Sequence, residues 1–188
     1  MTGAERLEAC IRSGGVAVFP ADTVYGLACD PADEAAIARL YALKGRPAAK
    51  PSAVMWFAVE PALAALPALG PRTRTAVERL LPGPVTVLLP DPASDGALGL
   101  RVPDIPSLAA VGVPVLQSSA NLASGPDARR LDEIPASIRE GADLVIDGGE
   151  LPGTPSTVVD LRPLEAGGEP VIVRDGALPA AEVLARLR

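Results

Sequence analysis

The amino-acid sequence predicts an α/β fold of the α+β kind: one domain over residues 1–188, in which a twisted mixed β-sheet is flanked by helices. Short apolar runs of strand length are interspersed with amphipathic helical segments. Several of these runs follow one another with only loops between them, which argues against a regular doubly wound parallel sheet. Pro (21) and Gly (18) are spread along the whole chain, and no internal repeat or low-complexity linker divides it.

The N-terminal segment predicts a helix, a strand and a second helix. Apolar residues recur on one face of residues 4–13, and a Gly pair ends this helix. Residues 16–19 form a short apolar strand closed by proline, and residues 21–26 are expected to form a loop. Asp30, followed by proline, is typical of a helix N-cap. The helix behind it delivers Lys44 at its C-terminal end.

The remaining elements follow from the same two periodicities. The predicted strands are apolar runs bounded by turn residues: 52–57, 85–89, 98–102, 113–116, 143–146, 157–161 and 171–173. The predicted helices have apolar residues three or four positions apart: 72–81, 131–140 and 179–187. The second of these contains Pro135, and the strand at 98–102 contains Arg101 in an otherwise apolar run.

The amino-acid composition limits the classes of function and of catalytic mechanism that are open to this chain. The formal charge of −6 argues against non-specific affinity for a nucleic-acid backbone. Histidine is absent, which excludes Ser-His-Asp and Cys-His nucleophile systems and His-ligated zinc. Lys, Arg, carboxylates, hydroxyls and backbone amides remain. Such groups suit reactions catalysed by positioning and charge stabilisation, of which phosphoryl or nucleotidyl transfer is the leading example.

The sequence contains neither the pattern of a secretion signal nor that of a membrane-spanning segment. The N-terminus has no apolar signal-peptide region, and no apolar run approaches the ~20 residues of a membrane span. Cys10 and Cys29 stand alone, without metal-ligand spacing. The sequence therefore predicts a cytoplasmic protein with reduced thiols, no membrane partner and no dedicated metal site.

Positive charge is distributed unevenly between the two basic residue types. Lys44 and Lys50 are the only lysines in a chain with 17 basic residues, and Arg46 lies between them. A compact ammonium combined with a planar guanidinium suits a polyanion better than a single carboxylate. We therefore predict a phosphate site. The alternative is a pair of solvated lysines after a helix end.

Three other polar groups stand at strand ends or within apolar runs, where a rigid scaffold can direct them at a ligand. The first is the hydroxyl of Thr23 after the first strand, which is also explained by an ordinary loop. The second is the run Ser118–Asn121, which is also typical of a capped turn. The third is Arg101 and Arg174 with the hydroxyl of Ser156; a buried arginine needs an anion, or an edge position.

Eight segments carry a resemblance that spans nearly the whole chain. They are 19–27 (FPADTVYGL), 44–47 (KGRP), 81–86 (LPGPVT), 100–103 (LRVP), 118–121 (SSAN), 146–149 (IDGG), 156–160 (STVVD) and 173–177 (VRDGA). In this order they resemble the YrdC-like family of threonylcarbamoyl-AMP synthases, in its short single-domain form. The paired signature of that family is present as Lys44/Arg46 and Ser119/Asn121.

The resemblance implies a YrdC-like fold and a nucleotidyltransferase. It would join L-threonine, bicarbonate or CO2, and ATP into L-threonylcarbamoyladenylate, with release of pyrophosphate. Mg²⁺ bridging the phosphates is expected. The product would serve threonylcarbamoyladenosine modification of tRNA, which it would reach through downstream transferase proteins.

The resemblance also implies roles for individual residues. Catalysis would fall to Lys44 and Arg46. ATP binding would fall to Arg46, Lys50, Ser119, Asn121 and Arg174. Threonine binding would fall to Thr23, Arg101 and Ser156, with Arg101 as the partner of the carboxylate.

Three positions depart from the family pattern. Ala21 replaces a hydroxyl residue, Met55 stands where many members have histidine near the threonine, and Lys50 lies where some have asparagine. Two alternatives therefore remain open. One is a related YrdC-like enzyme that acts on another carbamoyl or acyl adenylate, and the other is a non-catalytic RNA-binding module.

Overall fold

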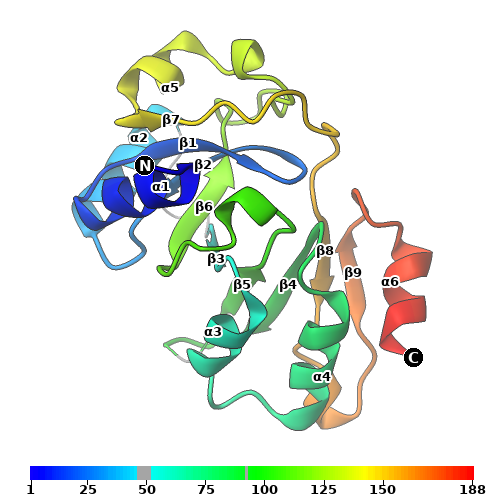
Figure 1. Ribbon diagram of the computed structural model, residues 1–188. Helices are drawn as coiled ribbons and strands as arrows, with labels where there is room; N and C mark the ends of the chain where they lie inside the picture. Colours follow the sequence, from blue (N-terminus) through cyan, green and yellow to red (C-terminus); the bar gives the residue numbers. More distant parts are fainter. Residues whose placement is uncertain (46–51, 92) are drawn as a thin grey trace.

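The computed structural model describes residues 1–45, 52–91 and 93–188. Within these ranges nine strands form one sheet in the order β7-β1-β2-β6-β3-β5-β4-β8-β9 (Figure 1). The strands are β1 Ala17–Ala21, β2 Val24–Cys29, β3 Ala53–Met55, β4 Val85–Pro90, β5 Ala97–Arg101, β6 Val115–Ser119, β7 Leu144–Val145, β8 Thr157–Asp160 and β9 Val171–Arg174. The pairs β1–β7, β3–β5 and β4–β8 are parallel and the other pairs are antiparallel. The predicted mixed sheet is thus confirmed.

Helices cover the two halves of the sheet differently. They are α1 Gly3–Arg12, α2 Glu34–Leu43, α3 Val59–Ala64, α4 Pro71–Leu80, α5 Ala136–Gly141 and α6 Ala180–Leu187, with 3-10 turns at Pro106–Leu108, Leu131–Glu133 and Leu164–Ala166. On β1 and β2, α2 and α5 pack against one face and α1 against the other, because alternate residues of a strand point to opposite faces. On β4, β5 and β8, helices α3, α4 and α6 share one apolar core.

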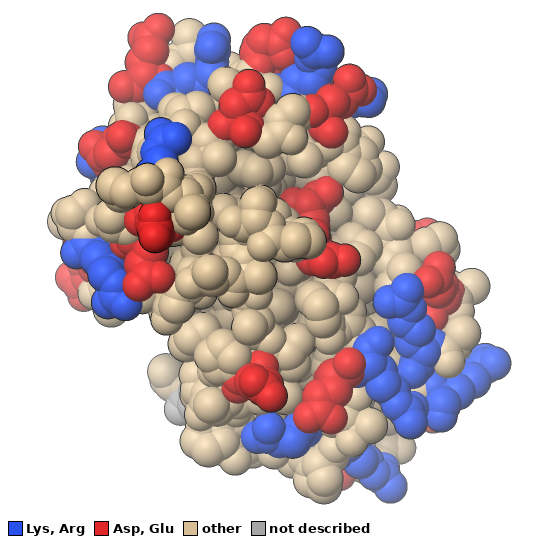
Figure 2. All heavy atoms as spheres, viewed as in Figure 1, with Lys and Arg blue, Asp and Glu red and all other residues tan. Residues whose placement is uncertain are grey.

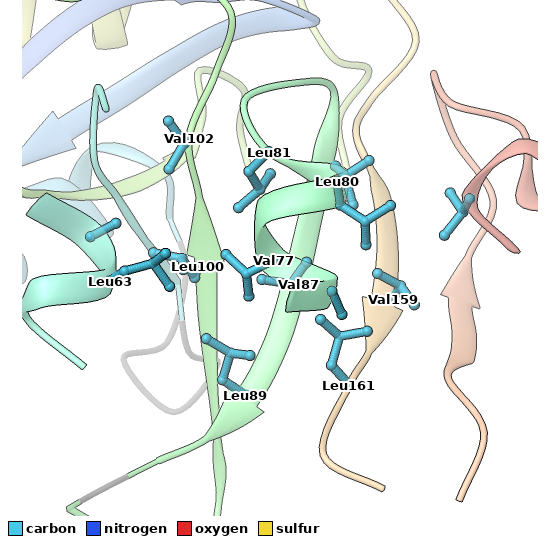
Figure 3. Packing of buried hydrophobic residues seen from close by; sticks show 14 of the residues in the cluster. Leu63, Val77, Leu80, Leu81, Val87, Leu89, Leu100, Val102, Val159 and Leu161 are labelled. Carbon is cyan, nitrogen blue, oxygen red and sulfur yellow. The ribbon is translucent and has the colours of Figure 1, made fainter. Parts of the chain in front are cut away.

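That core leaves the opposite face of β4 and β5 open. Val87 and Leu89 of β4 are fully buried against α4, beside Leu100 of β5 (Figure 3). Val85 of β4 is fully buried in the same core. Because side chains alternate, Thr86 of β4 must point to the other face. Because every second residue of β4 is apolar and buried, the residues between them are left for the open face of the sheet.

The segment after β1 departs from the sequence prediction. Residues 21–26 are not a loop, because β2 begins at Val24 and pairs with β1 from Ala21↔Val24 to Ala17↔Ala28. The turn consists of Asp22 and Thr23, and Asp22 has φ 60°. Aspartate tolerates this left-handed conformation, so two residues suffice to reverse the chain.

Two helix boundaries also differ from those expected. The N-cap of α2 is Asp33, whose carboxylate accepts hydrogen bonds from the amides of Ala35 (2.9 Å) and Ala36 (3.0 Å). Asp30 instead accepts from the amide of Ala32 and closes a turn before the helix. The predicted helix at 131–140 is divided: the 3-10 turn ends at its C-cap Ile134, whose backbone is extended before proline, and Pro135 is the N-cap of α5. Helix α3 has no counterpart among the predicted elements.

Strand β9 forms one edge of the sheet. Val171 and Val173 on it are 51% and 56% exposed, the largest exposures of any described valine or leucine. Among the described residues, no helix is long and apolar enough to cross a lipid bilayer.

Candidate functional site

A cleft of about 380 Å³ lies on the open face of the sheet. Its lining comes from strands, from the β1–β2 turn and from the segment before β8: Thr23, Val24, Ser52, Ala53, Thr86, Leu88, Ala97, Gly99, Arg101, Gln117, Ser118, Ser119, Asp127, Pro155, Ser156, Val158 and Arg174. Five of the residues predicted from the sequence are in this set. They are Thr23, Arg101, Ser119, Ser156 and Arg174.

A larger depression lies elsewhere. It measures about 700 Å³ and lies between α4 and α6, where Arg72, Arg79 and Arg188 contribute to its lining. Figure 2 shows basic side chains gathered over this corner, whereas both signs are interspersed over the rest of that face. None of the predicted site residues that the structure describes lies there, so we place the candidate site in the sheet cleft.

Arg101 is the most deeply buried charge in the cleft, at 3% exposure. Its Nη2 donates to Asp22 Oδ1 (2.5 Å), to the carbonyl oxygen of Ala21 (3.1 Å) and to Thr23 Oγ1 (3.2 Å). Its Nε is buried without a hydrogen-bond partner among the described residues. An unsatisfied buried donor costs about 1–3 kcal/mol, so an acceptor supplied by a ligand would be favoured there.

The Asp22–Arg101 pair is held out of water. Burial lowers the pKa of Arg101, and the nearby guanidinium of Arg174 lowers it further. Burial also raises the pKa of Asp22, although its attraction to Arg101 acts in the opposite direction. Desolvation therefore outweighs the mutual attraction of the pair. Two guanidiniums and one buried carboxylate leave this end of the cleft with positive charge for an anion.

Arg174 and the two hydroxyls of Thr86 and Ser156 form the neighbouring wall. Arg174 donates from Nε (3.2 Å) and Nη2 (2.7 Å) to the carbonyl oxygen of Ser156, and from Nη2 to Ser156 Oγ (3.3 Å). Thr86 Oγ1 and Ser156 Oγ are 2.9 Å apart. Thr86 was not among the predicted site residues. The strand alternation that buries Val85 and Val87 is the signal that would have identified it.

Lys44 and Asn121 lie outside the lining of the cleft. Lys44 caps the C-terminus of α2, and its Nζ donates to the Asn121 carbonyl oxygen (2.8 Å), to Asn121 Oδ1 (2.9 Å) and to the Ser119 carbonyl oxygen. Ser119 Oγ donates to the same Oδ1 (2.7 Å). Asn121 Nδ2 donates to Gly125 O (2.6 Å) and to Asp127 Oδ1 (3.3 Å). The segment from Ser119 to Gly125 is thus a closed hydrogen-bond network.

Three of the other residues that the sequence analysis singled out lie outside the described residues or in the hydrophobic core. Arg46 and Lys50 lie outside the described residues. Met55 is fully buried in the core below α1 and is paired with Arg101 in the β3–β5 register. Gln117 and Asp127 line the cleft although no role was predicted for them, and Ser118 of the predicted polar run lines it as well. In the part of the chain that the structure describes, no three His, Cys, Asp or Glu residues are grouped to hold a metal ion.

Comparison with known proteins gives one consistent result. The family model Sua5/YciO/YrdC, described as "Telomere recombination", matches residues 9–176. A Chromohalobacter salexigens protein named threonylcarbamoyl-AMP synthase is 39% identical over 171 residues, which cover 82% of this chain and 90% of that protein.

Two solved structures resemble the whole chain. Pyrococcus abyssi Sua5 complexed with L-threonine has a TM-score of 0.83 and 28% identity; the match covers 97% of this chain and 56% of that one. Escherichia coli YciO has a TM-score of 0.77 and 26% identity, covering 96% of this chain and 92% of that one.

Proposed function

The chain belongs to the Sua5/YciO/YrdC family, and from that membership we propose that it is an L-threonylcarbamoyladenylate synthase. As a nucleotidyltransferase it would condense L-threonine, bicarbonate or CO2, and ATP, and would release pyrophosphate. The observation that carries the proposal is the Nε of buried Arg101, which has no partner among the described residues, in a cleft that also holds Arg174 and the hydroxyls of Thr23, Thr86 and Ser156.

The threonine carboxylate would be the acceptor that Arg101 Nε lacks. Nη2 is already engaged by the β1–β2 turn, so the guanidinium is oriented before the amino acid arrives. Thr23, Thr86 and Ser156 offer hydroxyls around the same position. Neutral hydroxyls can orient the polar groups of an amino acid without adding charge.

The nucleotide would be bound by Arg174 and Ser119 of the cleft lining, with Asn121 hydrogen-bonded to Ser119. Arg46 and Lys50 complete the ATP-binding set as a prediction from the sequence. The threonine amine and CO2 form a carbamate with loss of a proton. A carbamate oxygen then attacks the α-phosphorus in line, and the bond from that phosphorus to the pyrophosphate oxygen breaks. One well-placed donor to the developing charge contributes about 3–4 kcal/mol.

Mg²⁺ would accompany ATP. Because the described residues contain no cluster of metal ligands, the phosphates themselves would be its principal ligands, and it would offset their charge. The adenylate is a mixed anhydride, so we expect a transferase protein to pass its threonylcarbamoyl group to tRNA in the cytoplasm.

The test is pyrophosphate release from ATP and bicarbonate in the presence of each of the twenty amino acids. We expect release that requires both L-threonine and bicarbonate. Release with another amine would favour an enzyme for a different carbamoyl or acyl adenylate. Absence of release together with salt-dependent RNA affinity would favour an RNA-binding module.

Arg46→Ala is expected to lower the rate of pyrophosphate release at least about 100-fold, because removing one donor to a developing charge has costs of this size. The melting temperature should stay close to that of the wild type. Arg12→Ala, which removes an exposed arginine paired with Glu8 on α1, is the matched control. Turnover like that of the wild type in Arg46→Ala would remove the phosphate assignment.

Thr86→Val is expected to raise the KM for L-threonine about tenfold, since it removes a buried hydroxyl whose hydrogen bond is worth about 1 kcal/mol or slightly more. Ser156 would lose the partner that holds its hydroxyl. Steady-state kinetics with Thr75→Val, an exposed threonine of α4, provides the control. An unchanged KM for threonine would exclude the Thr86–Ser156 pair from amino-acid recognition.

A further inference from the structure

We propose that Lys44 is a positioning residue: it fixes the Ser119–Asn121 turn in the shape that binds the nucleotide, and it does not itself contact the phosphates. This inference rests on the proposed function for its consequences. The contacts of Lys44 with Ser119 and Asn121, on which the inference is based, are present in the protein without any ligand. It revises the direct catalytic role that the sequence predicted for this lysine.

The donors of the Lys44 ammonium are already used. A lysine ammonium has three N–H donors and no acceptor. Among the described residues, three acceptors converge on Lys44 Nζ: two backbone carbonyl oxygens, of Ser119 and Asn121, and the side-chain Oδ1 of Asn121. The residue is 2% exposed. A phosphate oxygen could bind this nitrogen only by displacing one of the three.

The main chain of Lys44 holds the same turn from a second point. Its carbonyl oxygen accepts a hydrogen bond from the amide of Ala123 (2.8 Å), and its own amide donates to Leu40 in the last turn of α2. Leu40 is fully buried. The lysine is therefore anchored on a packed helix. It reaches residues 75 and 77 positions away in the sequence.

The acceptors of Lys44 are the groups that define the turn. Asn121 Oδ1 is shared between Lys44 Nζ and Ser119 Oγ, which settles the orientation of the amide, because both neighbours donate. Asn121 Nδ2 is engaged by Gly125 and Asp127. With both ends of Asn121 occupied, Ser119 is the residue of this network that faces the cleft together with Asp127.

The three bonds from Lys44 Nζ to described residues run to neutral oxygens, so these bonds do not neutralise the charge of the lysine. Substitutions can therefore separate a role of the three N–H donors in holding the turn from a role of the positive charge alone. An arginine keeps the positive charge, but its planar fork cannot direct three N–H groups from one nitrogen at converging acceptors. Methionine keeps the length of the side chain and removes both the charge and the donors.

The first experiment measures amide hydrogen exchange in the ligand-free protein. We expect Lys44→Met to increase exchange at the amides of Ala123 and Gly125 at least about tenfold, because the turn loses its anchor. Lys50→Met removes the same charge from the same stretch of sequence and should leave these amides unchanged. Unaltered exchange in Lys44→Met would overturn the proposal. If that variant does not fold, Lys44→Arg carries the same comparison.

The second experiment is a double-mutant cycle on the KM for ATP. Lys44→Met and Asn121→Ala are each expected to raise it about 30-fold, and the double variant by no more than about threefold beyond either, because residues of one network are not additive. Additive effects would mean that Lys44 and Asn121 contact the nucleotide independently, which contradicts the proposal. So would an unaltered KM in Lys44→Arg, since charge alone would then suffice.

The two experiments separate this inference from the proposed function. Hydrogen exchange reports on the turn whether or not the protein releases pyrophosphate. If the wild type is inactive with threonine, titration with α,β-methylene ATP in a calorimeter replaces the KM in the cycle. A normal turn with no synthase activity would reject the function alone, and synthase activity with an unaffected turn in Lys44→Met would reject the inference alone.

Discussion

Replacing Arg101 with methionine is expected to raise the KM for L-threonine about 100-fold or more, because truncating a buried, hydrogen-bonded charge costs about 2–5 kcal/mol. The KM for ATP should change less than about threefold, since the interaction removed is made with the amino acid. The Nε of this residue is a buried donor without a partner in the described part of the chain, and a threonine carboxylate is a ligand group that matches it. Methionine keeps the bulk of the buried stem.

Two controls make the Arg101→Met result specific. The variant leaves Asp22 without its guanidinium, but this carboxyl can take up a proton, because burial already raises its pKa. Melting temperatures should show that the protein remains folded. Arg162→Met removes an exposed arginine whose partner, Asp160, does not line the cleft, and should alter neither KM. Equal increases in both KM values for Arg101→Met would mean that Arg101 only holds the β1–β2 turn.

Gly176→Ala is expected to disrupt the wall of the cleft that contains Ser156 and Arg174. A Cβ atom at this position would lie 2.4 Å from Pro155 O and 2.6 Å from both Ser156 C and Thr157 N. These are main-chain atoms and cannot rotate away. Inserting a methyl group into packed structure costs about 1–3 kcal/mol or more. If Ser156 moves by about 1 Å, we expect activity to fall about 100-fold.

The measurements for Gly176→Ala are urea unfolding and kcat/KM. Gly112→Ala is the matched control: its Cβ would meet only the flexible carboxylate of Glu8, at 3.5 Å and beyond, and a normal stability is expected. If Gly176→Ala has the stability and activity of the wild type, Ser156 and Arg174 do not depend on this close approach of two main-chain segments.

The strands were predictable because their apolar period and turn residues are local signals. β2 was missed because Asp22, Thr23 and Gly26 are all residues that favour turns, whereas in the fold its six residues are buried by contacts with β1 and β6. Burial by distant strands outweighed the local signal. One domain over residues 1–188 stays a prediction, as do the individual roles in binding ATP and threonine.

The site was predictable in its residue types and less so in its contacts. Thr23, Arg101, Ser119, Ser156 and Arg174 meet in one cleft, as the ordered motifs suggested. The sequence position of Lys44 indicated a cation near phosphate, but not that three acceptors far along the chain would occupy its donors. Such saturation depends on the path of two separate segments, which no local pattern encodes.

The order of the strands has a consequence during protein synthesis. The cleft combines Thr23 from the first hairpin with Arg174 from the last strand, and β8 is inserted between β4 and β9. A growing chain on the ribosome therefore holds Arg101 and its turn long before Ser156 and Arg174 emerge from the exit tunnel. The nascent protein can complete its cleft only after β9 has emerged, so we expect a chain interrupted before β9 to yield no active fragment.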